Sequence, residues 1–224
     1  MAVFQGVNGV GVNAGAAAAS GLHVITKPQD HGTLGHYAIS VLTGSIGAGM
    51  SANGELVQLR WTDATRVCVI TEVSCNGMYA STAFAAGVIT IGAIIARSWS
   101  VDGSGGNTLT LTGDNNQLRS SMGASLMGGA RSASTGALTA GTKTLDSQTF
   151  GLITTHSSGG VGSATPIIGS IYLPTTTLYK CDLASGEHPL VLVQNEGLVI
   201  RATVPATGVW TAGFTIKWME LTAF

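Results

Sequence analysis

The chain of 224 residues is long enough to bury the core of one large domain or of two small ones. Lys+Arg 10 against Asp+Glu 11 gives a formal net charge of -1, which excludes the basic surface that attracts nucleic acids and anionic membranes. Only 9% of the residues are charged, compared with about 25% in an ordinary soluble domain, while 45% are hydrophobic, so the chain resembles neither a disordered segment nor a free cytosolic monomer.

Residues 1 to about 36 are rich in Gly, Ala, Asn and Val and follow neither the helical nor the strand period. The alanines Ala16–Ala19 are flanked by Gly15 and Gly21, and so short a helix is marginal in water. We expect an extended N-terminal arm that becomes ordered against a partner. Because the first lysine is Lys27, no cationic segment precedes the alanines, and the sequence predicts no secretory signal and synthesis in a reducing cytoplasm.

Three strands are predicted in the first part of the following domain. They cover Tyr37–Leu42, Leu56–Trp61 and Arg66–Val73, and the third is rich in β-branched residues, which favour strands. A Gly- and Ser-rich loop at 44–54 separates the first two. Residues 75–77, Cys-Asn-Gly, are predicted to form a turn, because Asn-Gly is the dipeptide that type I′ hairpins prefer.

The next segment, Gly87–Trp99, is apolar on both faces as far as Arg97. This pattern predicts a central or sandwiched strand. The apolar run Ala83–Ala96 is shorter than the ~18 residues that a membrane span needs, and it contains glycines. We therefore predict no transmembrane segment.

From Asp102 to about Ser163 the sequence consists mainly of Gly, Ser, Thr and Ala. Short strands are predicted only at Thr108–Thr112 and Thr149–Thr154. A structureless loop of this length is unusual in a compact domain. The stretch therefore either carries further short strands or projects as a hairpin or flap that contacts a neighbour.

A strand around Leu178–Cys181 leads to the most regular part of the chain, Pro189–Leu221. Two turns at 194–197 and 205–208, with Asn, Pro and Gly, divide this part into three strands. Apolar residues occupy every second position of the last two strands, namely Leu198, Ile200, Ala202, Val204, Trp210, Ala212, Phe214, Ile216 and Trp218. We predict a three-stranded antiparallel meander with one buried face.

Eight or so strands with turn signals between them, and no long amphipathic helix, predict an all-β fold. The expected architecture is a β-sandwich of the jelly-roll type. No internal repeat or linker is evident. The predicted organisation is an extended arm at 1–36 and a single sandwich domain at 37–224, with a Gly/Ser/Thr-rich insertion around 102–163.

The cysteines Cys68, Cys75 and Cys181 are odd in number and cannot form a closed set of disulfides. The first two lie too far apart along one strand to bridge unless the chain reverses between them. We expect free, buried thiols. The sequence has no Gly-x-Ser-x-Gly elbow, and we expect no catalytic residue and no enzymatic activity.

The five histidines do not form a pattern of metal ligands. His31 and His36 lie five positions apart without a helix to bring them together, and His23, His156 and His188 are scattered among loops. We expect structural or solvated histidines and no metal ion.

Two Gly-rich turns at 102–107 and 113–116 supply Asp and Asn oxygens, as calcium loops do, but they lack the bidentate Glu of such loops. Plain turns are therefore expected. No phosphate loop or dinucleotide fingerprint is present, so no cofactor is expected. The tryptophans offer stacking faces for a sugar, but apolar neighbours favour core packing of Trp61, Trp99, Trp210 and Trp218.

Three segments carry a resemblance to a known class of proteins: RWTDATRVCVITEV, ARSWSVDGSGGNTLTLTGDNNQLRSSM and HPLVLVQNEGLVIRATVPATGVWTAGFTIKWMEL. In overall style, over about residues 35 to 224, the chain resembles virion structural proteins of tailed bacteriophages, of the capsid decoration or cement kind. The resemblance implies a β-sandwich or jelly roll that trimerises on the capsid and joins neighbouring major capsid subunits. It also implies an extended N-terminal arm.

The first functional hypothesis is therefore a non-enzymatic capsid decoration subunit that strengthens the shell, made in the host cytoplasm and located on the virion surface. Its partners are the major capsid protein and further copies of itself, most simply in a trimer whose contacts come from the stretch 102–163. Neither nucleic acid nor a membrane is an expected partner. The alternative is a carbohydrate- or receptor-binding module of a tail fibre or surface lectin. A lectin needs a concave site with convergent polar groups, whereas a cement protein needs large flat contacts.

Overall fold

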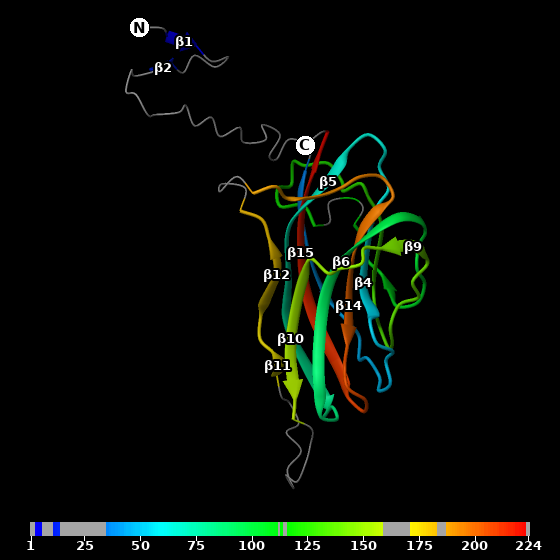
Figure 1. Ribbon diagram of the computed structural model, residues 1–224. Helices are drawn as coiled ribbons and strands as arrows, with labels where there is room; N and C mark the ends of the chain where they lie inside the picture. Colours follow the sequence, from blue (N-terminus) through cyan, green and yellow to red (C-terminus); the bar gives the residue numbers. More distant parts are fainter. Residues whose placement is uncertain are drawn as a thin grey trace.

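The computed structural model describes residues 3–5, 11–13, 35–111, 113, 116–158, 171–182 and 187–222. Every regular element in these ranges is a β-strand (Figure 1). The strands are β1 (Val3–Gln5), β2 (Gly11–Asn13), β3 (His36–Leu42), β4 (Gly54–Trp61), β5 (Val67–Thr82), β6 (Gly87–Val101), β7 (Asn107–Thr108), β8 (Met127–Ser132), β9 (Thr142–Leu145), β10 (Gly151–Ser157), β11 (Ile171–Leu173), β12 (Thr176–Lys180), β13 (Leu190–Leu192), β14 (Glu196–Thr203) and β15 (Val209–Leu221).

Most of the predicted arm, 1–36, falls outside the described residues. Within it, β1 pairs with β2 in antiparallel orientation, and β3 begins at His36. No helix of the described ranges has the length and apolar character that crossing a membrane requires.

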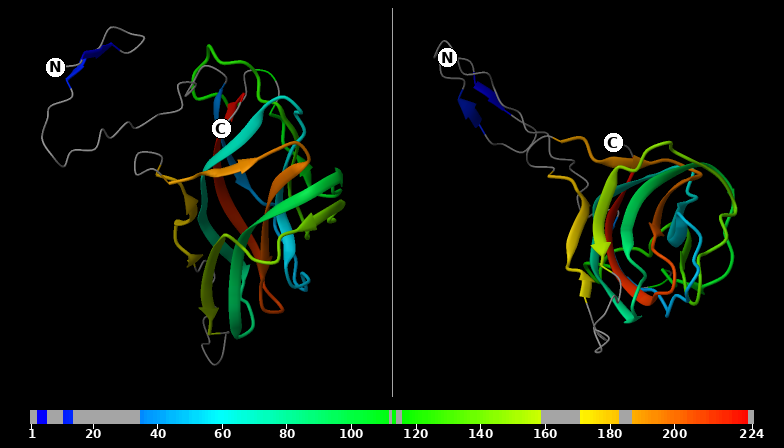
Figure 2. Two further views of the ribbon diagram at one scale, coloured as in Figure 1. Left: turned by 45° about the horizontal axis from the view of Figure 1, so that its top comes forward. Right: turned by 60° about the horizontal axis from the view of Figure 1, so that its bottom comes forward.

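The eight principal strands pair as a long hairpin folded on itself. β3 pairs with β15, β4 with β14, β5 with β12 and β6 with β10, all in antiparallel orientation. Further pairing of β15 with β5 and of β14 with β6 completes two sheets, β3-β15-β5-β12 and β4-β14-β6-β10. This is the strand order of a jelly roll, and it confirms the predicted all-β sandwich. Figure 2 shows the two sheets curved around a shared interior.

Short strands extend both sheets at their edges. β11, β12 and β13 pair one after another with the same long strand, β5. In the other sheet β8 lies beside β4, β7 lies beside β8, and β9 pairs with the distal half of β6. The predicted insertion at 102–163 therefore carries four strands within its described part, so the first of the two alternatives for this stretch is correct.

The predicted meander at the end of the chain is wrong, although its strands are correct. β13 pairs with β5 in the first sheet, β14 belongs to the second sheet, and β15 returns to the first. The alternation of apolar residues identifies a strand and its buried face, but it does not identify the neighbouring strand. The two turns thus lead the chain across the sandwich, and β14 and β15 face each other through the core.

The core confirms the predicted inward face of the last two strands. Leu198, Ile200 and Ala202 of β14 are buried, as are all the inward residues predicted for β15. Trp61, Phe84, Trp210, Phe214 and Trp218 are among the largest fully buried side chains. Val204 is only partly buried against this cluster.

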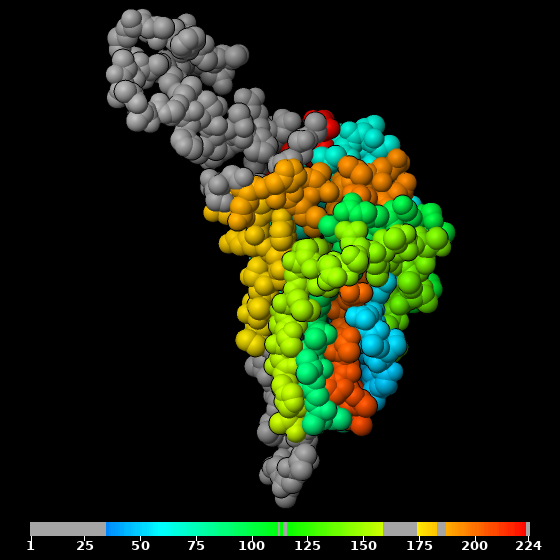
Figure 3. Space-filling model, viewed as in Figure 1, coloured from blue at the N-terminus to red at the C-terminus, as the bar shows by residue number. Residues whose placement is uncertain are grey.

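A second, smaller cluster lies on the outer side of the β4-β14-β6-β10 sheet. It contains Ile94, Ala96, Trp99 and Val199. Residues 133–150, here called the strap, lead from β8 beside β4 to β10 at the opposite edge, and Leu145 of the strap packs on the cluster. Figure 3 shows the strap crossing the upper half of this sheet in yellow-green, with the lower half uncovered. This second layer explains why β6 is apolar on both faces, as predicted.

The predicted turn at 75–77 is also wrong, because β5 continues unbroken from Val67 to Thr82. Gly77 lies opposite Gly213 and Cys75 lies opposite Phe214, so Asn76 is an extra residue on one strand. This is a β-bulge. Gly77 has a φ of 135°, which explains the glycine at the position where the strand is distorted.

Candidate functional site

The four tryptophans do not form an exposed binding platform. Each is at most 1% exposed, as the prediction of core packing required. The indole Nε1 of Trp61 donates to the carbonyl of Arg66, and that of Trp99 donates to the carbonyl of Val101, both at 3.0 Å. Any aromatic contact with a ligand must therefore come from another residue.

The three cysteines are free and buried, as predicted. Burial raises the pKa of the Cys68 thiol well above its usual value, and it raises the pKa of Cys75 and Cys181 as well. A raised pKa leaves the thiol protonated and poorly nucleophilic at neutral pH.

The histidines weighed as metal ligands are not brought together. His36 lies in β3 and His156 in β10, in different sheets, while His23 and His31 fall outside the described residues. Within the described ranges no three His, Cys, Asp or Glu side chains are grouped so that they could hold a metal ion.

The described residues of the two Gly-rich segments lie in loops, except for Asn107. Asp102 accepts a hydrogen bond from Arg60 at 3.0 Å in an ion pair. Asn107 belongs to the short strand β7, and Asn116 adopts a φ of 66°. Asp114 and Asn115 lie outside the described residues.

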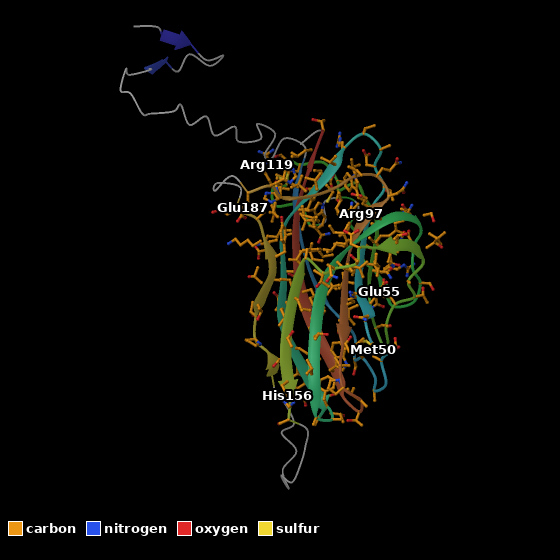
Figure 4. All side chains as sticks on the ribbon, viewed as in Figure 1. Met50, Glu55, Arg97, Arg119, His156 and Glu187 are labelled. Atoms are coloured by element: carbon orange, nitrogen blue, oxygen red, sulfur yellow. The ribbon has the colours of Figure 1, made fainter. Side chains whose placement is uncertain are left out.

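Two surfaces of the sandwich have features of contact sites. The first, here called the threonine face, is the uncovered half of the β4-β14-β6-β10 sheet. Register places Leu152, Gly92 and Arg201 in one row across three strands, and Thr154, Thr90 and Thr203 in the next row. Val88 and His156 form a third row, at the end of β10 where His156 is labelled in Figure 4. Side chains in register on neighbouring strands point to the same side of a sheet.

The threonine face is weakly polar and almost uncharged. Val88 is 54% exposed and Leu152 is 60% exposed. Arg201 is the only Lys, Arg, Asp or Glu in the three rows. Threonine and valine lose little side-chain entropy when a neighbour covers them. Such a face can make a broad contact, but it offers no group for acid–base or nucleophilic chemistry.

The second surface is a groove of about 700 Å³ on the outer side of the other sheet, here called the neutral groove. Its floor is the bulge, where Gly77 faces Gly213 and both strands lack a side chain. Leu42 and Tyr79, which are 68% and 44% exposed, stand on its walls. The groove exists because two glycines meet in register.

Neutral hydrogen-bonding groups surround this groove. The Asn76 side-chain amide donates to Thr215 Oγ1 at 2.7 Å, and Ser40 Oγ lies 3.0 Å from the same oxygen. Thr175 donates its hydroxyl to the Asn76 carbonyl at 3.2 Å. None of the groove's lining residues is charged. An apolar wall beside amide and hydroxyl groups can bind an uncharged ligand that has both apolar and hydroxyl-bearing faces.

Sequence reasoning missed both surfaces. The Asn-Gly dipeptide of the bulge was a visible signal, but it is equally typical of a hairpin turn. The three rows of the threonine face depend on strand pairing, which no local pattern specifies.

Comparisons of the chain with protein-family models, with curated protein sequences and with solved structures gave no match.

Proposed function

We propose that this protein is a non-enzymatic structural subunit of a virion, a capsid decoration or cement protein that binds and stabilises the shell of the major capsid protein. The threonine face carries the proposal. A sheet surface with exposed Val88 and Leu152 among threonines suits coverage by a large protein neighbour.

Composition and architecture support the same function. A chain with 9% charged residues and a mean hydropathy of +0.36 gains solubility when neighbouring subunits cover its weakly polar surface. A jelly roll provides a rigid body for such contacts, although a fold alone does not determine function. The proposed assembly is a homotrimer on the capsid surface, made in the host cytoplasm.

Electron microscopy of purified particles tests this proposal, because density for the protein should follow the shell lattice. The contact surface is tested by Thr154→Arg, which places a long cation in the middle row of the threonine face. Occupancy on particles should fall at least tenfold. The matched control is Thr177→Arg on β12 of the other sheet, where the side chain is also exposed. Unchanged occupancy of the Thr154→Arg protein contradicts the role of this face, and density elsewhere on the virion contradicts the decoration function.

The neutral groove favours a second candidate, a carbohydrate- or receptor-binding module. Tyr79 supplies a partly exposed ring, and Asn76 and Thr175 supply polar groups beside it. Sugars present both an apolar face and hydroxyl groups, so this combination matches their chemistry.

Saturation-transfer NMR with neutral oligosaccharides tests the second candidate. Binding should broaden or shift the Tyr79 ring signals and should disappear in Tyr79→Ala, while Tyr179→Phe serves as a control outside the groove. Absence of saturation transfer from a broad panel of neutral sugars rejects the carbohydrate candidate and leaves the decoration proposal untouched.

A further inference from the structure

Three side chains meet beneath the strap. Lys143 of β9 donates from Nζ to Oε2 of Glu55 on β4 at 2.8 Å. Gln58, also on β4, donates from Nε2 to the same carboxylate oxygen at 2.5 Å. An amine, a carboxylate and a carboxamide are thus joined through one atom. Glu55 is labelled in Figure 4.

Water is largely excluded from this cluster. Glu55 is 6% exposed, Gln58 is 2% exposed, and the side chain of Lys143 is 1% exposed. The Lys143 ammonium lies 4.5 Å from the centre of the Trp99 ring and donates to the Ala140 carbonyl. A buried lysine is therefore held in place with its nitrogen bonded to the same carboxylate oxygen as the Gln58 amide nitrogen.

The orientation of the Gln58 amide follows from its partners. Its Nε2 also donates to the Thr139 carbonyl at 2.8 Å, and both a carbonyl and an ionised carboxylate are acceptors, so the NH₂ group must face them. Its Oε1 is buried and accepts no hydrogen bond in the structure. An unsatisfied buried oxygen costs free energy, and stability alone does not explain why a glutamine occupies this position.

We infer that Lys143 and Gln58 form an intramolecular isopeptide bond, with Glu55 as the proton carrier. The Lys143 ammonium transfers a proton to the Glu55 carboxylate, and the neutral amine attacks Cδ of Gln58. Glu55 delivers this proton, and then the second proton that Nζ loses, to Nε2 as the Cδ–Nε2 bond breaks. An Nζ–Cδ amide forms, Nε2 leaves as an ammonium ion, and Glu55 is again a carboxylate, so the reaction needs no oxidant and no external co-reactant.

The arrangement of atoms suits this transfer. Glu55 Oε2 contacts both the nitrogen that attacks and the nitrogen that leaves, as a general acid–base group must. Holding the reactants in place replaces a bimolecular encounter, which is the main advantage of intramolecular reactions. Gly103 permits this close packing, since a Cβ at that position would overlap the Gln58 amide.

The bond would tie the strap to β4, so that the cover of the Trp99 cluster could not open. The three cysteines form no disulfide. An isopeptide bond supplies a covalent link that is insensitive to a reducing cytoplasm. This inference does not depend on the virion proposal.

Mass spectrometry of the purified full-length chain tests the inference directly. The denatured protein should be lighter than its uncross-linked mass by one molecule of ammonia. A proteolytic map should contain a branched peptide that joins the segment around Gln58 to the segment around Lys143. Ammonia is also lost when Asn-Gly forms a succinimide, as at Asn53 or Asn76, but that reaction leaves two separate peptides.

Variants then assign the roles. Lys143→Met and Glu55→Gln should both restore the full mass, whereas Lys217→Met, which removes a partly exposed lysine paired with Glu72 at 2.9 Å, should keep the mass loss. Persistence of the branched peptide in Glu55→Gln overturns the proton-carrier role. Full mass of the wild-type protein after prolonged incubation in the folded state, with two separate linear peptides, overturns the bond itself; this result does not require any variant to fold.

Discussion

The Tyr37 ring stacks on the Trp218 ring with centroids 5.5 Å apart and planes 19° apart, so the first strand of the jelly roll is packed against the last. Both side chains are fully buried, and β3 pairs with β15 through this point. The contact joins the beginning and the end of the domain's sequence, and it lies at the β3-β15 edge of the sandwich.

Truncation of the aromatic core should strongly destabilise the domain. Phe214→Ala and Trp218→Ala should each lower the free energy of unfolding by about 3–5 kcal/mol, the usual cost of removing a large buried aromatic. Trp218→Ala also removes one of the donors to Glu220, the Trp218 indole Nε1 at 3.2 Å. Urea titration measures the loss. The outward-facing Thr211→Ala should change stability by less than about 0.5 kcal/mol, and a similarly small change for Phe214→Ala would contradict the packing.

Glu220 should make the folded protein less stable as pH rises, whereas a surface carboxylate in an ion pair makes a protein less stable as pH falls. It is fully buried and accepts hydrogen bonds from the Ser125 hydroxyl at 2.7 Å and the Leu126 amide at 3.1 Å. Burial raises the pKa of Glu220 above its usual value of 4.5, while the hydrogen bonds oppose the shift. Because the folded pKa lies above the unfolded one, the contribution to stability is fully present below pH 4.5 and is lost as pH rises through the folded pKa.

The Glu220→Gln variant isolates this effect. The difference in unfolding free energy between wild type and Glu220→Gln should shift against the wild type as pH is raised from 4 to 7. Glu72→Gln, on the outer side of the sheet, is the control for general charge effects. A difference that stays constant with pH, or moves in favour of the wild type, would show that Glu220 is ionised in both states.

The two glycines under the neutral groove should respond differently to the same substitution. Gly77→Ala should cost about 1–3 kcal/mol, because its φ of 135° is strained for any residue with a Cβ. At Gly213 a Cβ would make only ordinary contacts, the nearest at 3.5 Å to the Asn76 Cβ. Gly213→Ala should therefore leave stability within about 0.5 kcal/mol. Thermal and urea unfolding of the pair decide this, and equal costs at both positions would contradict the bulge geometry.

Removal of residues 1–34 should leave the sandwich folded and weaken its attachment to particles. All strands from β3 onward lie outside the deleted segment. Circular dichroism should show an unchanged β-spectrum, while sedimentation with particles should show reduced occupancy. Unchanged occupancy would reject the role of the arm.

The isolated protein should form a closed homotrimer. Its low charge leaves large weakly polar surfaces, which neighbouring copies can cover without burying unpaired charges. Light scattering at micromolar concentration measures the mass. A monodisperse monomer under these conditions would contradict the trimer.

Much of the secondary structure was predictable from the sequence, because alternation is a local property. The buried positions of β15 follow from the spacing of Trp210 to Trp218, and the double-sided apolar pattern of β6 follows from its place under the strap. β8 was missed because its sequence, MGGARS, has two glycines and no alternation.

The strand partners and the sites were not predictable, since they depend on contacts between distant segments. The predicted meander was wrong because β13, β14 and β15 alternate between the two sheets. The predicted turn at Asn76 was wrong because Asn-Gly occurs in β-bulges as well as in hairpin turns. Lys143 and Gln58 carry no motif, and only the crossing of the strap brings one to the other.

The pairing of β3 and β5 with β15 has a consequence for synthesis on the ribosome. β15 is the central strand between them, yet it is translated after both. Until it emerges, β5 and β3 each have an unpaired edge, and Tyr37 lacks the Trp218 ring that stacks on it. Stalled or shortened products that lack β15 should therefore aggregate and appear in the insoluble fraction.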